Sequence, residues 1–353
     1  MAEKVMVAMS GGVDSAGAAL LLKEAGYEVS GVTLRLHGYR DRPGLCGSQE
    51  DLEEAARAAQ RIGIPHTVLD LRGPFQRAVM DRFVSEYERG RTPNPCIDCN
   101  REIKFGALLD WALAQGADKL ATGHYARVRY EESTGRWLLL RGLDRRKDQS
   151  YVLYQLGQRQ LSRLVLPVGE HDKPSIRALA AKYGLANAEK PDSQDICFVP
   201  GGDYVSFLRS YGRICPVPGD FTDRSGRILG RHRGQECYTV GQRKGLGISA
   251  GEPLYVIRKD LERGTVTLGP DEDLYSRELT ADHVNLISVP ALTAPMRVSA
   301  KTRYSQREAP AFAEPLQGGA IRVVFDEPQR AITAGQAVVL YDGERIVGGG
   351  TIR

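Results

Sequence analysis

Apolar residues in the first third of the chain fall alternately into short continuous runs and into helical repeats. Residues 4–9 (KVMVAM) form an apolar run that predicts a buried strand, residues 13–25 predict a helix, and residues 28–34 predict a second strand. Apolar positions then recur at helical spacing over residues 51–62, and residues 66–71 are typical of a third strand. This alternation predicts an α/β domain with a doubly wound parallel sheet.

The same alternation continues along the chain, with one interruption. Helices are expected at residues 75–87, 102–114 and within 151–183, and a strand is expected at residues 119–122. Residues 127–141 instead predict a β-hairpin. We interpret this hairpin as an insertion into the parallel sheet and not as another layer of it.

Beyond about residue 208 the pattern changes to short alternating runs separated by Gly, Pro and Asp, which is typical of small β-rich domains. These runs lie at residues 238–240, 253–258, 264–268, 320–325 and 337–341. The length of 353 residues also exceeds what one hydrophobic core usually organises. The expected domains are 1–205 for the α/β domain, 206–275 for a small central β-rich domain and 276–353 for a C-terminal β-barrel.

The composition is that of a soluble globular protein, with 42% hydrophobic and 26% charged residues. The net charge of +4 is mild, and the basic stretch 141–147 is compatible with a polyanionic partner or with an ordinary solvated surface. No apolar run of about 18 residues is present, and the N-terminus is too soon interrupted for a signal peptide. We therefore expect a cytoplasmic protein that binds no membrane, and nothing in the sequence demands more than a monomer.

Candidate chemistry first occurs where the first predicted strand meets the first helix. The loop Ser10–Ser15 (SGGVDS) leaves backbone N–H groups pointing outward, which makes an anion site. Gly11 and Gly12 allow phosphate oxygens to approach closely, and Asp14 can cap the helix or help to hold Mg²⁺. The loop lacks the lysine of a Walker P-loop and is not GxGxxG, which disfavours γ-phosphate transfer and dinucleotide binding. It resembles the pyrophosphate loop of the adenylating N-type ATP pyrophosphatases.

Three of the six cysteines stand in contexts that suggest chemistry. Cys96 and Cys99 form a CxxC pair in a proline-framed turn just before an expected helix, where the pKa of a thiol is lowered. Cys197 follows far downstream, in DSQDICF. In a reducing compartment such cysteines remain thiols, catalytic groups or metal ligands. Taken alone, the pair could be half of a structural zinc site and Cys197 a buried core residue, but an adenylating loop in the same chain favours chemistry.

Seven specific stretches follow one another over nearly the whole chain. They are VAMSGGVDS, RTPNPCIDCNREIKF, ATGHYAR, KDQSYVLYQL, KPDSQDICFVPGGDY, YTVGQRKGLGI and FDEPQRAITAGQAVVLY. In this order they resemble the family of bacterial tRNA-specific 2-thiouridylases, which install sulfur on C2 of the wobble uridine of certain tRNAs. The resemblance implies an ATP-dependent tRNA-uridine 2-sulfurtransferase that adenylates the uracil O2, so that AMP becomes a leaving group for sulfur.

The resemblance also implies an ATP site and two catalytic thiols. The implied ATP-site residues are Ala8, Met9, Ser10, Gly11, Gly12, Val13, Asp14, Ser15, Leu34 and Gly123. In the persulfide version of the reaction, Cys197 carries the terminal sulfur and Cys99 is the thiolate that attacks or resolves it. The resulting Cys99–Cys197 disulfide is reset by a cellular reductant. ATP and Mg²⁺ are the implied cofactors, and a sulfur-relay protein or free sulfide is the implied donor.

The expected macromolecular partner is tRNA, bound at its anticodon stem-loop. The residues implied to meet the target base are Asn94, Pro95 and Cys96. Those implied to position the rest of the tRNA are His124, Lys147, Asp148, Gln149, Arg303, Tyr304 and Gln336. For each polar residue taken alone, a solvated surface or a loop hydrogen bond is the simpler interpretation.

Cys96 departs from the family pattern, because many members carry Asp there in an acid/base role. Asp98 is the neighbouring carboxylate, but it is out of register by two positions. Cys96, Cys99 and Cys197 are also the set of thiols that would hold three irons of a [4Fe-4S] cluster, with the fourth iron left to bind hydrosulfide. The persulfide and cluster routes both stay open on the sequence.

Two other functions also stay open on the sequence. An adenylating ligase or amidotransferase for a small metabolite would use the loop, but it leaves the paired cysteines and the β-rich third without a role. A non-catalytic tRNA-binding iron-sulfur protein would retain the loop without using it. The intact SGGVDS argues against such decay.

Overall fold

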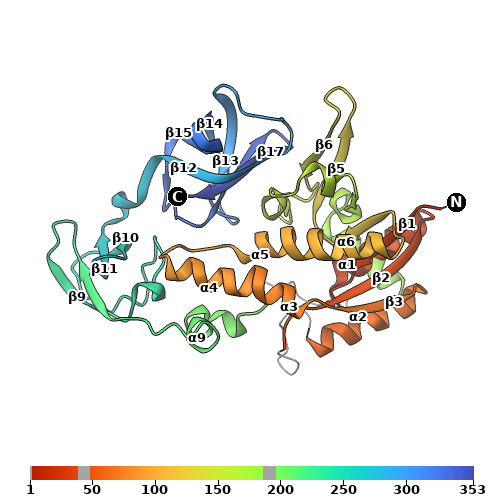
Figure 1. The fold of residues 1–353 in the computed structure, drawn as a ribbon, viewed down its shortest axis with the longest axis horizontal. Coiled ribbons are helices and arrows are strands. Elements are labelled where there is room, and N and C mark those ends of the chain that lie inside the picture. Colours follow the sequence, from red (N-terminus) through yellow and green to blue (C-terminus); the bar gives the residue numbers. More distant parts are fainter. Residues whose placement is uncertain (1, 39–47, 186–195) are drawn as a thin grey trace.

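A computed structural model describes residues 2–38, 48–185 and 196–353 of the chain. Residues 190–195 of the stretch KPDSQDICFVPGGDY lie outside the described residues, whereas Cys197 lies within them. The C-terminal barrel lies over the first domain, beside the hairpin β5–β6, and the central β-rich module lies to one side (Figure 1).

Five parallel strands form the sheet of the first domain, in the order β3-β2-β1-β4-β7. Their bounds are β1 Lys4–Ala8, β2 Glu28–Arg35, β3 His66–Asp70, β4 Lys119–Thr122 and β7 Leu164–Val165. The doubly wound parallel sheet predicted from the sequence is confirmed. β7 is the exception, because its two residues lie in a stretch expected to be helical and a strand this short leaves no pattern of its own. Short helices flank it, namely Ser150–Leu153, α7 Gln158–Leu161 and Pro167–Glu170.

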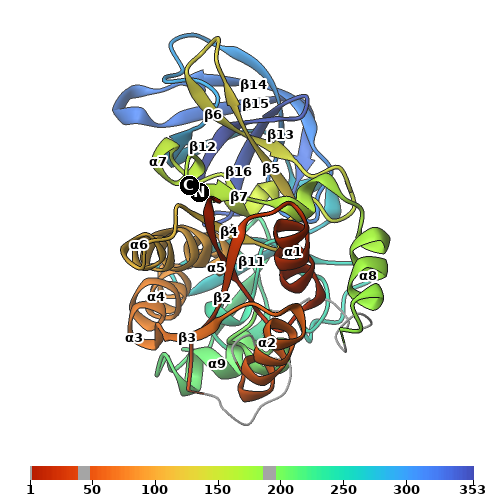
Figure 2. The same ribbon diagram turned by 90° about the vertical axis from the view of Figure 1, so that its right-hand side faces the viewer.

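Helices cover both faces of this sheet (Figure 2). One face carries α1 Val13–Glu24, α2 Gln49–Ile62 and α8 Lys173–Lys182, and the other carries α3 Arg72–Phe75, α4 Asp81–Glu88, α5 Pro95–Asp98 and α6 Leu109–Ala114. The π-helical segments Gln76–Met80 and Cys99–Leu108 join α3 to α4 and α5 to α6. Gly17 allows α8 to approach α1, because a Cβ at Gly17 would lie 2.6 Å from Cγ2 of Ile176.

Six antiparallel strands close into the C-terminal barrel, in the order β12-β15-β14-β13-β16-β17 and back to β12. Their bounds are β12 Tyr275–Leu286, β13 Met296–Lys301, β14 Ala309–Pro315, β15 Ile321–Arg330, β16 Ala337–Asp342 and β17 Arg345–Ile352. The hairpin of β5 Ala126–Glu131 and β6 Arg136–Arg141 pairs with the barrel where Leu140 meets Arg345. The hairpin is therefore an insertion that leaves the parallel sheet, and it attaches the first domain to the barrel.

The central module has its own sheet, in the order β10-β11-β8-β9, and its own hydrophobic core. Its strands are β8 Gly219–Thr222, β9 Ile228–His232, β10 Tyr255–Asp260 and β11 Thr265–Gly269, and α9 Tyr204–Ser210 precedes them. Residues 238–240 were expected in a strand but form a loop, because the Gln242 side chain accepts the Thr239 N–H (3.1 Å) and turns the chain. Two mainly-β units thus follow the α/β domain, as predicted.

Within the described ranges, no helix combines the length and apolar character that crossing a bilayer requires.

Candidate active site

The loop Ser10–Ser15 joins β1 to α1 at the carboxyl edge of the parallel sheet, as predicted. Gly11 has a left-handed φ of 75°, and a Cβ there would lie 2.8 Å from the Asp51 carbonyl oxygen. The Ser15 hydroxyl donates to the Gly12 carbonyl (2.9 Å) and accepts the Ser10 N–H (3.1 Å). Ser15 therefore holds the loop in a fixed shape at the N-terminus of α1, where the helix dipole favours an anion.

Asp14 lies in the first turn of α1 and does not cap it, since Gly12 is the N-cap and makes no side-chain bond. The Asp14 carboxylate instead binds two side chains from other elements. Lys173 Nζ lies 2.8 and 2.7 Å from its two oxygens, and the Tyr125 hydroxyl donates to it at 2.8 Å. Lys173 is the first residue of α8 and is 6% exposed. A buried cation thus lies beside a loop that has none of its own.

Gly123, which follows β4, lies directly against the loop. A Cβ on Gly123 would come within 2.7 Å of both the Asp14 carbonyl carbon and the Ser15 nitrogen. Such proximity follows from β1 and β4 being neighbours, since the carboxyl ends of parallel strands share one edge. Leu34 lies one strand away, on β2, and is buried in the main hydrophobic core.

The remaining predicted ATP-site residues belong to the strand-to-helix junction itself. Ala8 ends β1, Met9 follows it and is buried, and Val13 begins α1. The structure thus brings the loop, its flanking residues and Gly123 together. Leu34 contributes packing behind this edge of the sheet.

His124 and Gln149 shape the chain around Tyr125. Nδ1 of the buried His124 lies 2.7 Å from the Thr122 hydroxyl. Burial, and then the charge of Lys104, hold the pKa of His124 well below its usual range, so its ring is neutral. The Gln149 side chain accepts the Tyr125 N–H (3.0 Å), and the Gln149 N–H donates to the Tyr125 carbonyl (2.8 Å). Gln149 therefore fixes the backbone of Tyr125, whose hydroxyl binds Asp14, and His124 directly precedes Tyr125.

The CxxC pair lies inside a helix and not in a turn before it. The helix begins at Pro95, well before residue 102, because proline is favourable at a first helical position. The Asn94 side chain caps it by accepting the Cys96 N–H (3.1 Å). Cys99 opens the π-helical segment, a rare backbone form that occurs frequently at functional sites.

Cys99 and Cys197 pack against the same hydrophobic cluster. Cys99 is 7% exposed within it, and Cys197 is half-buried at its edge. Phe198, next to Cys197, packs edge-on against Phe83, with ring centroids 5.4 Å apart. Cys96 is exposed. Two of the three candidate thiols thus share one cluster, and the third faces outward.

Asp98 lies one residue before Cys99 and is buried. Its carboxylate lies 3.4 Å from Arg82 and 3.5 Å from Arg101. Burial raises the pKa of Asp98 to about 6, an effect that these two arginines oppose. A buried carboxyl group with a raised pKa, paired with two arginines, therefore precedes the buried Cys99 in the chain.

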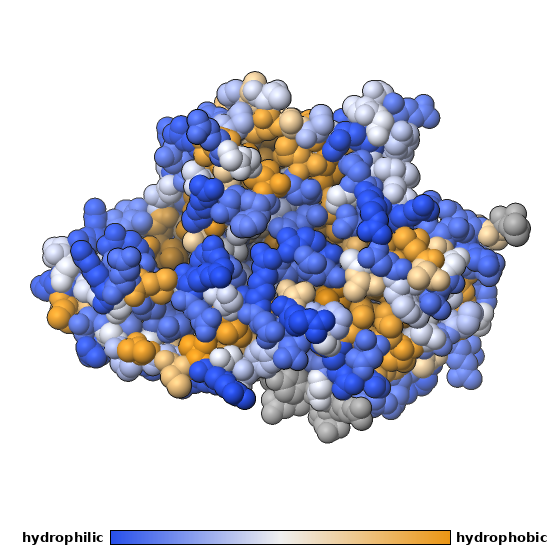
Figure 3. All heavy atoms as spheres, in the orientation of Figure 1, coloured by the Kyte–Doolittle hydropathy of each residue, from blue (hydrophilic) through white to orange (hydrophobic). Residues whose placement is uncertain are grey.

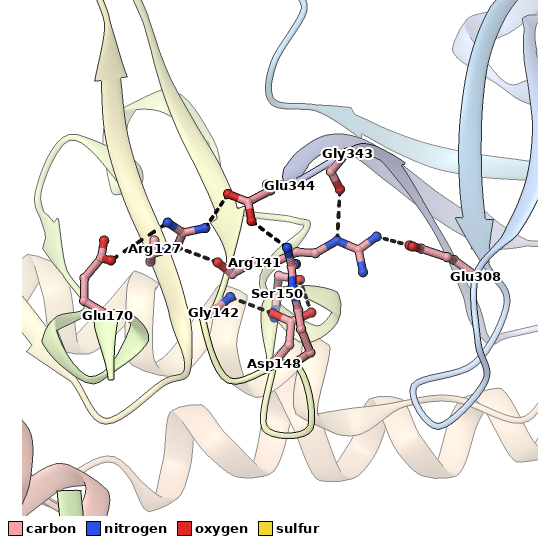
Figure 4. A network of polar contacts seen from close by, with 10 residues as sticks. Arg127, Arg141, Gly142, Asp148, Ser150, Glu170, Glu308, Gly343 and Glu344 are labelled. Atoms are coloured by element: carbon pink, nitrogen blue, oxygen red, sulfur yellow. Dashed lines mark hydrogen bonds and ion pairs between the residues drawn. The ribbon is translucent and has the colours of Figure 1, made fainter. Parts of the chain in front are cut away.

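The loop that carries Lys147, Asp148 and Gln149 is fixed by its own hydrogen bonds (Figure 4). Asp148 accepts the Gly142 N–H and the Ser150 N–H at 3.1 Å, and its other oxygen accepts the Ser150 hydroxyl at 2.9 Å. The Asp148 side chain thus faces its own loop. Its contact with tRNA stays a prediction.

Arginines of the hairpin and the following loop bind carboxylates of the barrel (Figure 4). Arg127 and Arg145 lie 2.7 and 2.6 Å from the two oxygens of Glu344, and Arg141 pairs with Glu308. The basic stretch 141–147 is consequently part of a domain contact. Only part of its charge is available to a polyanion.

Tyr304 brings the barrel to the same loop. Its hydroxyl donates to the Asp148 carbonyl (3.4 Å). Burial raises the pKa of Tyr304, and the nearby charges of Asp148 and Cys96 add to the effect. Asp148 and Cys96, which are far apart in sequence, therefore both lie within electrostatic range of Tyr304.

Gln336 and Arg303 both contact other domains. Gln336 Nε2 donates to the Thr92 carbonyl (2.7 Å), next to the segment that enters α5. Arg303 donates to the Val240 carbonyl (3.1 Å) of the central module. These two predicted tRNA-contacting side chains thus fix the barrel against its neighbours.

Within residues 2–38, 48–185 and 196–353, no group of three or more His, Cys, Asp or Glu side chains could hold a metal ion. Cys96 is exposed, whereas Cys99 is buried. Cys96, Cys99 and Cys197 as ligands of a [4Fe-4S] cluster therefore stay a prediction, and we derive no step through such a cluster.

Lys173 and Tyr125 are the site residues that sequence reasoning missed. The helix start at Lys173 is readable, because Asp172 is an N-cap residue and Pro174 is favourable in a first turn. The sequence does not show that Lys173 pairs with Asp14, because the two residues are 159 positions apart. A helix start that is predicted from sequence does not show which loop it faces.

Three family models match successive parts of the chain. A tRNA methyl transferase HUP domain matches residues 3–201, a tRNA methyl transferase PRC-barrel domain matches residues 206–270, and an aminomethyltransferase beta-barrel domain matches residues 276–352. The first of these alone covers more than half of the chain.

Curated relatives match along the whole length. The tRNA-specific 2-thiouridylase MnmA of Acetivibrio thermocellus is 49% identical, with 99% of both chains covered. Those of Heliobacterium modesticaldum and Moorella thermoacetica are both 52% identical, covering 100% and 98% of this chain and 93% and 98% of their own. Because this identity extends over the α/β domain and both β-rich units alike, the chain belongs to the tRNA-specific 2-thiouridylase family.

Proposed function

We propose that this protein catalyses the ATP-dependent 2-thiolation of the wobble uridine of tRNA. One observation carries the proposal: a loop built for phosphates, with a buried cation at Asp14, occurs in the same domain as two thiols packed on one cluster. The loop alone would serve any adenylating enzyme. The paired thiols, and relatives that are named 2-thiouridylases, narrow the reaction to sulfur transfer on tRNA.

In the first step the loop holds the β- and γ-phosphates of ATP while the uracil O2 attacks the α-phosphate. Pyrophosphate leaves, and the adenylated base carries AMP as its leaving group. Lys173 neutralises Asp14, so the N-terminus of α1 stays attractive to phosphate oxygens. Mg²⁺ is usually bound through substrate phosphates and one or two carboxylates, and the Asp14 carboxylate would have to bind it alongside its bonds to Lys173 and Tyr125.

In the second step Cys197 carries a sulfane sulfur, delivered by a relay protein or derived from free sulfide and an oxidant. The terminal sulfur attacks C2, AMP leaves, and C2 is then joined to Cys197 through two sulfurs. The Cys99 thiolate attacks the Cys197 sulfur, which releases the 2-thiouridine and forms a Cys99–Cys197 disulfide. A two-electron dithiol reductant restores both thiols. Both residues pack against the main hydrophobic core, and their pairing stays a prediction.

We assign the α/β domain 1–205 to ATP and sulfur chemistry, and the domains 206–275 and 276–353 to holding tRNA. Asn94, Pro95 and Cys96 would meet the extruded base at the start of α5, near Tyr304 of the barrel. His124, Lys147, Asp148, Gln149, Arg303 and Gln336 would position the tRNA mainly by fixing the loops that contact it. We place the reaction in the cytoplasm, with the protein acting as a monomer.

The decisive experiment measures the products of ATP in the presence of tRNA. Purified protein, ATP, Mg²⁺ and a tRNA with a wobble uridine should release pyrophosphate and not orthophosphate. A transcript with cytidine at the wobble position should give no release above background. Release that is independent of tRNA would contradict the proposal and favour a small-molecule ligase.

Gly123→Ala should raise the KM for ATP about tenfold or more, because the added Cβ would overlap the backbone of Asp14 and Ser15 and shift the loop. Pyrophosphate release as a function of ATP concentration measures this. Gly251→Ala is the matched control, since a Cβ there meets nothing within 4 Å. An unchanged KM in Gly123→Ala would show that the loop does not contact ATP.

A further inference from the structure

The chain between α4 and α5 is tied to α4 by a buried ion pair. Glu86 of α4 is 8% exposed, and its two carboxylate oxygens lie 2.7 Å from Nη2 and 2.6 Å from Nε of Arg91. The Arg91 N–H also donates to the Glu86 carbonyl (2.9 Å). A carboxylate bound by two nitrogens of one guanidinium fixes geometry as well as charge. Glu86 therefore holds the first residue of the entry segment, residues 91–94, in place.

The barrel holds the next residue of the entry segment. The Thr92 N–H donates to the Ala334 carbonyl (2.9 Å), and the Thr92 carbonyl accepts from Nε2 of Gln336 (2.7 Å). Both partners lie in the loop 331–336, which joins β15 to β16. Gly335 of this loop has a left-handed φ of 88°, and a Cβ there would lie 2.8 Å from Cβ of Arg91 and 2.9 Å from the Thr92 nitrogen. The close contact therefore requires glycine at position 335.

The entry segment leads directly into the helix of the CxxC pair. Only Pro93, whose ring fixes its φ, separates Thr92 from Asn94, the N-cap of α5. Glu86 and Gly335 line one cavity of about 30 Å³ between α4, α5 and the barrel. Figure 1 shows both helices below the barrel, and hydrophilic side chains gather between them and the barrel on the face shown in Figure 3. A shift of the barrel loop is therefore transmitted to the start of α5.

We propose that Glu86 and Gly335 are positioning residues for the reaction on the target base. Glu86 acts through the Arg91 guanidinium, and Gly335 admits the barrel loop to the entry segment. The inference rests on the proposed function, in which the start of α5 meets the extruded base. The barrel then acts on the rate of the reaction through the protein chain, a role distinct from contacting tRNA. A misplacement of about 1 Å can cost about 10²-fold in rate. The entry segment therefore governs kcat, whereas the affinity for tRNA rests mainly on phosphate contacts made elsewhere.

Gly335→Ala tests the barrel side of the entry segment. It should lower the kcat of tRNA-dependent pyrophosphate release about 10- to 100-fold, because the added Cβ overlaps Arg91 and Thr92 and displaces the segment. The Kd for tRNA should stay within about threefold of wild type. Gly318→Ala is the matched control, since Gly318 also has a positive φ, of 72°, but a Cβ there meets nothing within 4 Å. The control carries a similar backbone strain and should keep the wild-type kcat.

Glu86→Gln tests the α4 side, in a double-variant cycle with Arg91→Met. Glu86→Gln keeps the shape of the side chain but leaves Arg91 without its buried carboxylate partner. Its kcat should fall about tenfold or more, again with a Kd for tRNA near that of wild type. If Glu86 acts through Arg91, the double variant should be no slower than the slower single variant, because either change alone breaks the pair. Losses that multiply in the double variant would overturn this route.

The kinetics separate positioning from two other roles. A raised Kd for tRNA with wild-type kcat in Gly335→Ala would mean that the barrel loop contacts tRNA itself, and would overturn the inference. A lowered melting temperature with wild-type kcat in the folded fraction would mean a purely structural contact, and would overturn it as well. If Glu86→Gln does not fold, the comparison of Gly335→Ala with Gly318→Ala still decides. If wild-type protein itself neither binds tRNA nor releases pyrophosphate with it, the proposed function fails instead.

Discussion

Cys99→Ser should abolish formation of 2-thiouridine, with a loss of at least about 10³-fold, because removal of an attacking nucleophile costs that much or more in enzymes that depend on one. The substitution replaces sulfur by oxygen at a site that is 7% exposed and leaves the surrounding cluster in place. Adenylation precedes the sulfur step, so tRNA-dependent pyrophosphate release should persist. Nucleoside analysis of digested tRNA measures the thiolated product, and a pyrophosphate assay on the same sample measures activation.

Cys237→Ser is the matched control, because Cys237 is 5% exposed in the core of the central module. This substitution also places a hydroxyl group at a buried position, as Cys99→Ser does. It should retain thiolation. tRNA affinity of the Cys99→Ser variant should stay within a few-fold of wild type. Parallel loss of tRNA binding and pyrophosphate release in that variant would identify Cys99 as a structural thiol and remove it from the mechanism.

The phosphate loop is the part of the site that local sequence determines. A strand, two glycines and a helix within one short stretch already dictate an anion site, and the structure has this arrangement with Gly11 at positive φ. The two cysteines of the CxxC pair illustrate the limit. A proline-framed segment favours a turn on local grounds, yet Pro95 begins a helix because Asn94 caps it and apolar residues downstream pack into the core.

Contacts between distant segments account for what sequence reasoning missed. β7 is too short to leave a pattern, and it is a strand only because β4 lies beside it. The sequence predicts the β5–β6 hairpin, but it does not predict that the hairpin pairs with β17 of the barrel. Gln336 and Arg303 could be singled out by resemblance, whereas their bonds to Thr92 and Val240 depend on how three units pack together.

The sequence likewise does not show how the charge of the phosphate loop Ser10–Ser15 is balanced. The loop sequence contains an acid, Asp14, and no base, which reads as an unfavourable place for ATP phosphates unless Mg²⁺ neutralises it. Lys173 resolves this, because Gly17 lets α8 approach α1 closely enough for the lysine to reach both carboxylate oxygens. Paired with Lys173, the Asp14 carboxylate no longer carries an unbalanced charge that would repel the phosphates, and its orientation is fixed.

Lys173→Met should therefore lower the rate of tRNA-dependent pyrophosphate release by about 10²-fold, because an unpaired carboxylate in the first turn of α1 repels the phosphates by a few kcal/mol. Methionine keeps an unbranched apolar side chain and removes the ammonium, whose nitrogen lies 5.9 Å from the centroid of the Tyr125 ring. Asp14 then stays negative at the mouth of the anion site and repels the phosphates. The KM for ATP should rise along with the fall in kcat, and Lys173→Arg should recover part of the activity.

Lys182→Met is the matched control for the loss of an ion pair between α1 and α8. Lys182 ends the same helix and pairs with Glu24 at the other end of α1 (3.9 Å), but it is exposed and lies away from the loop. Both variants remove one ion pair between α1 and α8, so a purely structural role for Lys173 would lower the melting temperature without changing the KM for ATP in the folded fraction. A Lys173→Met enzyme with wild-type KM and kcat would mean that the loop tolerates an uncompensated Asp14. In that case Mg²⁺, and not Lys173 of α8, must balance the charge of the Asp14 carboxylate.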